Sequence, residues 1–168
     1  MNDIQTTTLY IIRHAEAGQH GDPQYPDDSL RPLTKQGHKR FRRLVKKLVK
    51  RGFAPALVAT SPFVRCRQTA DVLAEIVRSN PQPMELSVLE PGARLAPLVQ
   101  WTASQAAHEI AWVGHAPDVN YLAAELIGAK PEAIRFVKGA IAAIEFNSAV
   151  AAGAGELVWL VTPKASGG

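Results

Sequence analysis

The sequence predicts an α/β fold, a three-layer sandwich with a mostly parallel central sheet flanked by helices and with antiparallel strands late in the chain. Short apolar runs rich in β-branched residues, such as 9–13, 56–60 and 109–113, alternate with longer segments that carry apolar residues at helical spacing. The runs are apolar on both faces, which is typical of strands covered by helices on both sides. Alternation of strands and helices favours a parallel sheet.

The remaining elements follow from the same periodicities and from local start and stop signals. Thr34 is a candidate N-cap, Gly52 ends the helix that it opens, and Pro81 and Pro83 end the next one. A turn at 151–155 joins two late strands. We therefore expect strands at 9–13, 56–60, 85–89, 109–113, 140–146 and 156–162, and helices at 34–51, 63–79, 93–106 and 117–127.

Length and composition limit the classes of protein that the chain can belong to. Its 168 residues suit one domain. The single cysteine, Cys66, excludes an internal disulfide framework and is simplest to explain in a reducing cytoplasm. A signal peptide begins with a positively charged region, but residues 1–8 carry no positive charge. No apolar run is long enough to span a bilayer. We expect a cytoplasmic protein without a membrane partner.

Positive charge is concentrated in one predicted helix. The net charge is +4, yet residues 35–51 hold nine Lys or Arg residues and no acid. The simplest interpretation is a solvated face, since the apolar stripe of this helix docks on the sheet. The alternative is a docking surface for an acidic protein partner. A nucleic-acid partner is not expected, because Phe41 is the one aromatic residue of the segment and faces the core.

Two histidines directly follow predicted parallel strands. His14 follows strand 9–13 and His115 follows strand 109–113. Arg13 stands beside His14, and Arg65 opens the helix after strand 56–60. Active sites of such sheets lie beyond the carboxyl ends of the strands. A neutral imidazole can accept a phosphoryl group, and guanidiniums bind phosphate oxygens. We expect the nearby guanidiniums to help keep His14 unprotonated. This chemistry needs no metal or cofactor.

Four segments resemble motifs of the histidine phosphatase superfamily, the phosphoglycerate mutase-like group. Arg13-His14-Ala15 is similar to its Arg-His-Gly signature, and 61–70 (SPFVRCRQTA) to its Ser-x-x-x-Arg-x-x-Gln-Thr-Ala segment. Residues 112–115 (WVGH) resemble its second histidine motif. Residues 28–37 (DSLRPLTKQG) resemble the stretch before its first helix, in the form found in SixA-type phosphohistidine phosphatases.

The resemblance implies a histidine phosphatase domain at 1–163, followed by a flexible tail at 164–168. It implies that His14 is the nucleophile, that Arg13, Arg65 and His115 bind the phosphoryl group, and that Arg31 assists them. Ser61 either contacts phosphate or caps the following helix. The implied activity is a metal-independent phosphatase that acts on phosphohistidine of a signalling protein.

The position of the general acid does not follow the family closely. Glu90 lies roughly where many relatives carry a catalytic carboxylate, after the third strand, and Glu16 and Asp118 are alternatives. The lack of a clearly placed general acid suits a phosphohistidine substrate, because its leaving nitrogen can be protonated before the reaction. Two other functions stay open at this point: a phosphatase of small phosphate esters, and a non-catalytic module that binds phosphorylated ligands.

Overall fold

The computed structural model describes residues 5–166 and places six strands in one sheet, in the order β3-β2-β4-β1-β5-β6. The first four of these are mutually parallel, and β5 runs antiparallel to both of its neighbours, β1 and β6, which confirms the predicted fold class. The strands are β1 (Thr7–Arg13), β2 (Leu57–Thr60), β3 (Met84–Glu85), β4 (Glu109–Gly114), β5 (Ile141–Phe146) and β6 (Glu156–Val161).

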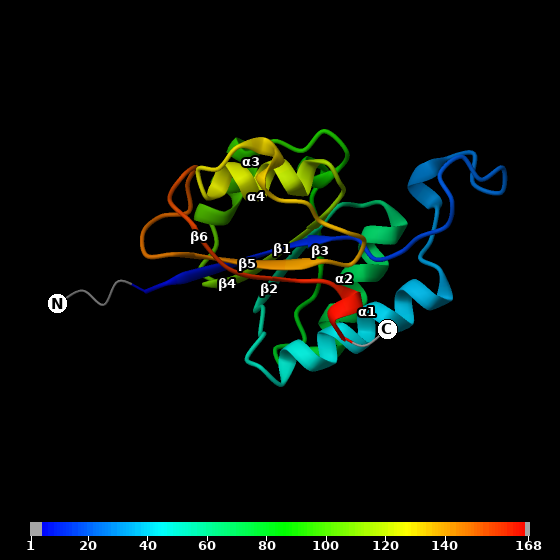
Figure 1. The fold of residues 1–168 in the computed structure, drawn as a ribbon, viewed down its shortest axis with the longest axis horizontal. Helices are drawn as coiled ribbons and strands as arrows, with labels where there is room; N and C mark the ends of the chain where they lie inside the picture. Colours follow the sequence, from blue (N-terminus) through cyan, green and yellow to red (C-terminus); the bar gives the residue numbers. More distant parts are fainter. Residues whose placement is uncertain (1–4, 167–168) are drawn as a thin grey trace.

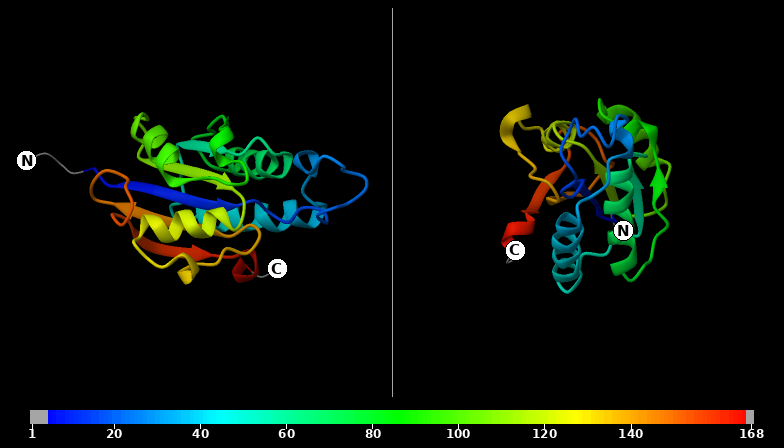
Figure 2. Two further views of the ribbon diagram at one scale, coloured as in Figure 1. Left: turned by 90° about the horizontal axis from the view of Figure 1, so that it is seen from above. Right: turned by 90° about the vertical axis from the view of Figure 1, so that its right-hand side faces the viewer.

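Helices cover both faces of this sheet (Figure 1). The pair α1 and α2 lies on one face, and α3 and α4 lie on the other, as the end-on view in Figure 2 also shows. Their bounds are α1 (Lys35–Val49), α2 (Val64–Ile76), α3 (Leu95–Ala103) and α4 (Asp118–Leu126). Short 3-10 turns occur at Asp28–Leu30, Ser87–Leu89, Pro131–Ala133 and Pro163–Ser166.

Successive residues of β1 supply the cores of both faces. Leu9 and Ile11 pack with residues of α3 and α4, whereas Tyr10 and Ile12 pack with residues of α1 and α2. This alternation follows from the two-residue side-chain period of a strand. Burial on both faces of the sheet explains why the sequence of β1 is continuously apolar. It also fixes the register that places the end of β1 beside the end of β4.

The basic helix α1 forms as its sequence predicts. The Thr34 hydroxyl accepts a hydrogen bond from the Gly37 amide at 2.9 Å, so Thr34 is the N-cap. The apolar stripe Phe41, Leu44, Val45 and Leu48 is buried, and the cations lie mainly on the opposite side. The interpretation of that side as a solvated face is therefore consistent with the packing of the helix.

Two expected segments differ in detail. Strand 85–89 was predicted too long, because β3 ends at Glu85 and Ser87–Leu89 turns into a 3-10 helix that buries Leu89. The start of the expected tail forms a 3-10 turn, Pro163–Ser166, and 167–168 lie outside the described residues. The flexibility of 164–168 and the domain boundary at 163 stay predictions.

No helix within residues 5–166 combines the length and the apolar character that crossing a membrane requires.

Candidate active site

The paired ends of β1 and β4 bring His14 and His115 together. Arg13 and Gly114 are register partners, and the His14 amide donates to the Gly114 carbonyl at 3.0 Å. The two imidazole centroids lie 5.5 Å apart. Both rings line a cavity of about 670 Å³ at this edge of the sheet, here called the catalytic cavity.

The hydrogen bond of His14 fixes which ring nitrogen is free. His14 Nδ1 lies 2.7 Å from the carbonyl oxygen of Ala15. A carbonyl oxygen can only accept, so Nδ1 carries the proton in the neutral ring. The lone pair is then on Nε2, the nitrogen that can attack an electrophile.

Burial keeps the His14 ring neutral. Burial first, and the nearby His115, Arg65 and Arg13 in smaller part, lower the pKa of His14 from 6.5 to about 3. The hydrogen bond to the Ala15 carbonyl acts in the opposite direction. The guanidiniums act in the direction that the sequence predicts, but removal of the ring from water is the larger cause of its low pKa.

Both nitrogens of His115 have protein partners. Nε2 lies 2.9 Å from Ser61 Oγ, and Nδ1 lies 3.4 Å from Arg65 Nη2. Burial and then Arg65 lower the pKa of His115 to about 4, so this ring is also neutral near pH 7. Ser61 Oγ accepts from the Phe63 amide at 3.3 Å as well, and Phe63 is the N-cap of α2.

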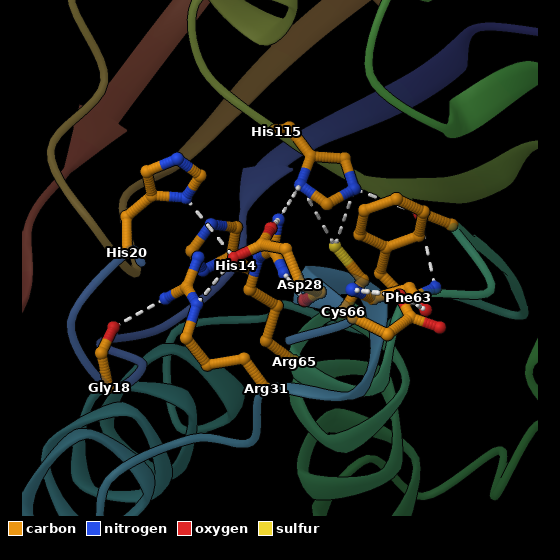
Figure 3. A network of polar contacts seen from close by, with 12 residues as sticks. His14, Gly18, His20, Asp28, Arg31, Phe63, Arg65, Cys66 and His115 are labelled. Carbon is orange, nitrogen blue, oxygen red and sulfur yellow. Dashed lines mark hydrogen bonds and ion pairs between the residues drawn. The ribbon is translucent and has the colours of Figure 1, made fainter. Parts of the chain in front are cut away.

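An acidic residue without a role in the sequence interpretation organises the arginines. Asp28 accepts a hydrogen bond from Arg31 Nε at 2.8 Å and forms an ion pair with Arg65 Nη2 at 3.0 Å (Figure 3). His20 Nδ1 lies 3.2 Å from the same carboxylate. Hydrogen bonding by Arg31 and the charge of Arg65 hold the pKa of Asp28 well below its usual range, so it is ionised.

Both of these arginines are buried and further held by backbone oxygens. Arg31 is 6% exposed and donates to the Gly18 carbonyl, while Arg65 is 5% exposed and donates to the Asp28 carbonyl at 2.8 Å. The guanidinium of Arg65 also lies 5.0 Å from the centre of the Phe63 ring. The two cations therefore have fixed positions at the edge of the catalytic cavity.

Arg13 also lines the catalytic cavity. Its Nη1 donates to the Phe136 carbonyl at 2.9 Å, and its buried Nε has no hydrogen-bond partner among residues 5–166. The structure thus brings the predicted residues Arg13, His14, Arg31, Arg65 and His115 to one cavity.

The carboxylates near this cavity differ in position. Asp28 and Asp118 line it, whereas Glu90 does not, although the adjoining Pro91 and Gly92 do. Asp118 Oδ2 accepts from the Gly92 amide at 2.8 Å, which holds the loop after Glu90 against α4. The assignment of Glu90 as general acid stays a prediction.

Two further motif residues connect the loops around His14. Thr69 Oγ1 accepts from the Ala15 amide at 3.0 Å and donates to the Arg65 carbonyl at 2.7 Å. Gln68 Oε1 accepts from the Leu33 amide at 2.8 Å. The Gln-Thr pair therefore joins α2 to the segments on both sides of the site, a role that helical periodicity could not indicate.

This geometry defines a phosphate-handling enzyme, because a neutral nucleophilic imidazole and several fixed guanidiniums face one cavity. The comparisons agree. The family model of the histidine phosphatase superfamily (branch 1) matches residues 9–86. The phosphohistidine phosphatase SixA of Escherichia coli is 25% identical over 158 residues, which cover 92% of this chain and 93% of that protein. An uncharacterised protein of Picosynechococcus is 37% identical over 116 residues, 67% of this chain and 68% of that protein.

Solved structures give the same result. The structure of the protein histidine phosphatase SixA complexed with tungstate has a TM-score of 0.81 at 25% identity and covers 94% of this chain and 98% of its own. A mycobacterial glucosyl-3-phosphoglycerate phosphatase shares the fold, with a TM-score of 0.68 at 17% identity over 92% of this chain and 98% of its own. The chain belongs to the histidine phosphatase superfamily, and it is a phosphatase of the SixA type.

Proposed function

We propose that this phosphatase removes the phosphoryl group from phosphohistidine on a protein through a covalent intermediate on His14. The observation that carries the proposal is the hydrogen bond from His14 Nδ1 to the Ala15 carbonyl, since it leaves a lone pair on Nε2 of a buried neutral ring. The E. coli relative named as a phosphohistidine phosphatase supports the substrate class.

In the first step, Nε2 of His14 attacks phosphorus in line with the bond to the leaving nitrogen. The new N–P bond forms as the bond to the substrate imidazole breaks, and the proton already carried by that imidazole leaves with it. In the second step, water attacks phosphorus as the bond from phosphorus to Nε2 of His14 breaks. The bonding electrons return to Nε2 as its lone pair, Nδ1 keeps its proton, and both water protons leave on the phosphate. Both steps are phosphoryl transfers, in which positioning and charge stabilisation supply most of the acceleration.

Three guanidiniums bind the phosphoryl oxygens in this proposal, and the neutral His115 ring joins them when its Nε2–H exchanges Ser61 Oγ for a phosphoryl oxygen. Arg13, Arg31, Arg65 and His115 surround His14 in the catalytic cavity. His115 is held by Arg65 and Ser61, so Ser61 acts by positioning this ring rather than by binding phosphate. Arginines suit the role because they stay charged and offer several donors in a rigid plane.

The carboxylates that line the catalytic cavity favour phosphohistidine over an alkyl phosphate. Asp28 is ionised and engaged with two arginines, and Asp118 accepts two backbone amides. An alkoxide leaving group needs a proton from a placed acid, worth roughly 10²–10⁴ in rate. A phosphohistidine needs this acid less, because its leaving nitrogen can carry a proton beforehand.

Glu90 remains the candidate acid that the sequence predicts, and its dispensability can be measured. We expect Glu90→Gln to retain phosphohistidine hydrolysis within about twofold while it slows any hydrolysis of an alkyl phosphate by at least ~10-fold. If the hydrolysis rates of both substrates fell equally, Glu90 would be required for hydrolysis of phosphohistidine as well.

The proposal is tested by phosphate release from a phosphohistidine-bearing protein, p-nitrophenyl phosphate and a sugar phosphate. The variants are wild type, His14→Ala and the matched control His38→Ala, whose imidazole lies exposed on α1. Preference for phosphohistidine that His14→Ala abolishes and His38→Ala keeps is the expected result.

The other outcomes separate the alternatives. Preference for an ester, also abolished in His14→Ala, would keep the nucleophile and change the substrate to a small phosphate ester. Binding of phosphorylated ligands without turnover would indicate a non-catalytic module. A cytoplasmic location is part of the proposal, in keeping with the single buried thiol of Cys66.

A further inference from the structure

A second cavity opens on the other side of Arg13. It has a volume of about 560 Å³ and lies between the start of α1, the segment before β5 and the turn after β6. We name it the cationic cavity, because five positively charged side chains line it: Arg13, Arg40, Arg135, Lys138 and Lys164.

Positive charge in the cationic cavity exceeds negative charge. Glu16 is the one acidic residue among the described residues that line it, and it pairs with Arg40 at 3.4 Å. Burial, and second the positive charge of Arg135, lower the pKa of Arg13. This repulsion between two lining arginines is a sign that the lining lacks compensating anions and would be relieved by an anionic ligand.

The cationic cavity also offers apolar surface. Val137, which is 45% exposed, lines it together with the buried Phe41 and Phe136. Known ligand pockets span roughly 300–1,000 Å³, so this cavity has room for several side chains rather than for one small anion. A complementary ligand carries acidic groups next to an apolar one.

The two cavities adjoin each other. Arg13 and Lys138 line both of them, and Arg13 is the last residue of β1, directly before His14. A chain whose phosphorylated residue reaches His14 would thus place its neighbouring residues at the cationic cavity. A small phosphate ester can be accommodated within the catalytic cavity of about 670 Å³ alone, so a ligand that uses both cavities is a longer one, which favours a peptide as the occupant.

We propose that the cationic cavity binds an acidic segment, with an apolar side chain, that flanks the phosphohistidine of the protein substrate. This inference rests on the proposed function. It places the acidic-partner surface at Arg40, Arg135, Lys138 and Lys164, and not on the exposed side of α1 at Lys46 and Lys50. Recognition is electrostatic and weakens as ionic strength rises.

Two phosphohistidine peptides of equal length test the proposal, one with Asp, Glu and Leu flanks and one with Gln, Asn and Leu flanks. We expect wild type to hydrolyse the acidic peptide with a kcat/KM about tenfold higher than the neutral peptide. Arg135→Glu and Lys164→Glu bring this ratio to within about twofold of one. Both side chains are exposed, and Arg135→Gln and Lys164→Gln give smaller effects in the same direction if charge reversal disturbs folding.

Two control variants locate the effect. Lys130→Glu reverses an exposed charge that lines neither cavity and keeps the ratio. Lys46→Glu tests the exposed side of α1 and also keeps it. A wild-type ratio near one, or a ratio that Lys46→Glu abolishes and Lys164→Glu leaves intact, would overturn the proposal. The proposal would also be overturned if wild type preferred a small phosphate ester with a second anionic group over the acidic peptide, and if Lys164→Glu abolished that preference.

A binding measurement separates this inference from the proposed function. Fluorescence anisotropy of the labelled, unphosphorylated acidic peptide needs no turnover and uses His14→Ala protein. If neither phosphopeptide is hydrolysed but the acidic peptide binds and Lys164→Glu weakens it at least ~5-fold, the substrate class is wrong and the docking site stands. If hydrolysis occurs without any dependence on the flanks, the docking site is wrong and the function stands.

Discussion

The carboxylate of Asp28 lies 3.0 Å from Nη2 of Arg65, and the backbone carbonyl of Asp28 accepts from Nη1 of the same arginine. One loop residue thereby fixes both ends of a guanidinium that is 5% exposed. The same carboxylate accepts from Arg31 Nε, so two phosphate-binding candidates share one anchor. The precision of the arginine cluster depends on this single acid.

Asp28→Asn should therefore weaken catalysis without removing any group that contacts the substrate. The amide keeps an acceptor oxygen but loses the charge that orients Arg31 and Arg65, and misplacement by about 1 Å can cost ~10²-fold in rate. We expect kcat/KM to fall by about 10–100-fold, mainly through KM for the phosphorylated substrate. Steady-state kinetics measure this, with Asp27→Asn as the exposed control. Equal losses in both variants would mean that the loop, and not the charge, matters.

The tautomer of His14 predicts the chemical form of the intermediate. Because Nδ1 donates to the Ala15 carbonyl, the phosphoryl group should be found on Nε2. Rapid quenching of a turnover mixture in base, followed by chromatography of the hydrolysed protein, distinguishes the two phosphohistidine isomers. The Nδ1 isomer at this residue would show that the ring flips before it reacts.

The two depressed imidazole pKa values predict loss of stability in acid. Unfolded histidines bind protons below about pH 6.5, whereas the folded pKa of His14 is about 3 and that of His115 about 4. The unfolded state binds more protons in this window, so folding stability falls as the pH falls. Each ring lowers the free energy of unfolding by about 1.4 kcal/mol per pH unit of acidification in this window, or by about 2 kcal/mol between pH 6.5 and pH 5.

Urea unfolding at pH 7 and pH 5 measures this effect. The decrease in unfolding free energy should be smaller by about 2 kcal/mol in His14→Ala than in wild type. His38→Ala replaces an exposed imidazole and should show the decrease of the wild type. An unchanged decrease in His14→Ala would mean that its native ring accepts a proton near pH 6.

Local periodicity sufficed to predict the strands and to place His14 and His115 directly after two of them. That these two strands are neighbours, which the meeting of the two rings requires, is given by the structure. The role of Asp28 could not be predicted in this way. Its partner Arg65 lies 37 positions away, and the Gly- and Pro-rich loop that carries Asp28 has no repeating pattern. The strand expected at 85–89 failed for a related reason, since the burial of Leu89 in a turn depends on tertiary packing.

Cys66 should be chemically inert in the native protein. Burial raises the pKa of its thiol to about 12, although Arg65 stands next to it in sequence. The reactive species is the thiolate, so alkylation by iodoacetamide at pH 8 should be at least ~100-fold slower than in urea. Mass spectrometry of labelling over time measures both rates. Rapid labelling under native conditions would indicate that α2 opens and exposes the thiol.

Gly37 permits a close approach that holds the segment after His14. A Cβ at this position would lie 2.2 Å from the carbonyl oxygen of Glu16, and that oxygen accepts from the Thr34 amide at 3.0 Å. Helix propensity alone favours Gly37→Ala by about 0.5–1 kcal/mol. Overpacking against backbone costs about 1–3 kcal/mol, so we expect a net loss of stability in urea unfolding, together with lower kcat. Gln36→Ala, at an exposed neighbouring position of α1, should change neither by much. Gain of stability in Gly37→Ala would show that the Glu16 backbone can move without cost.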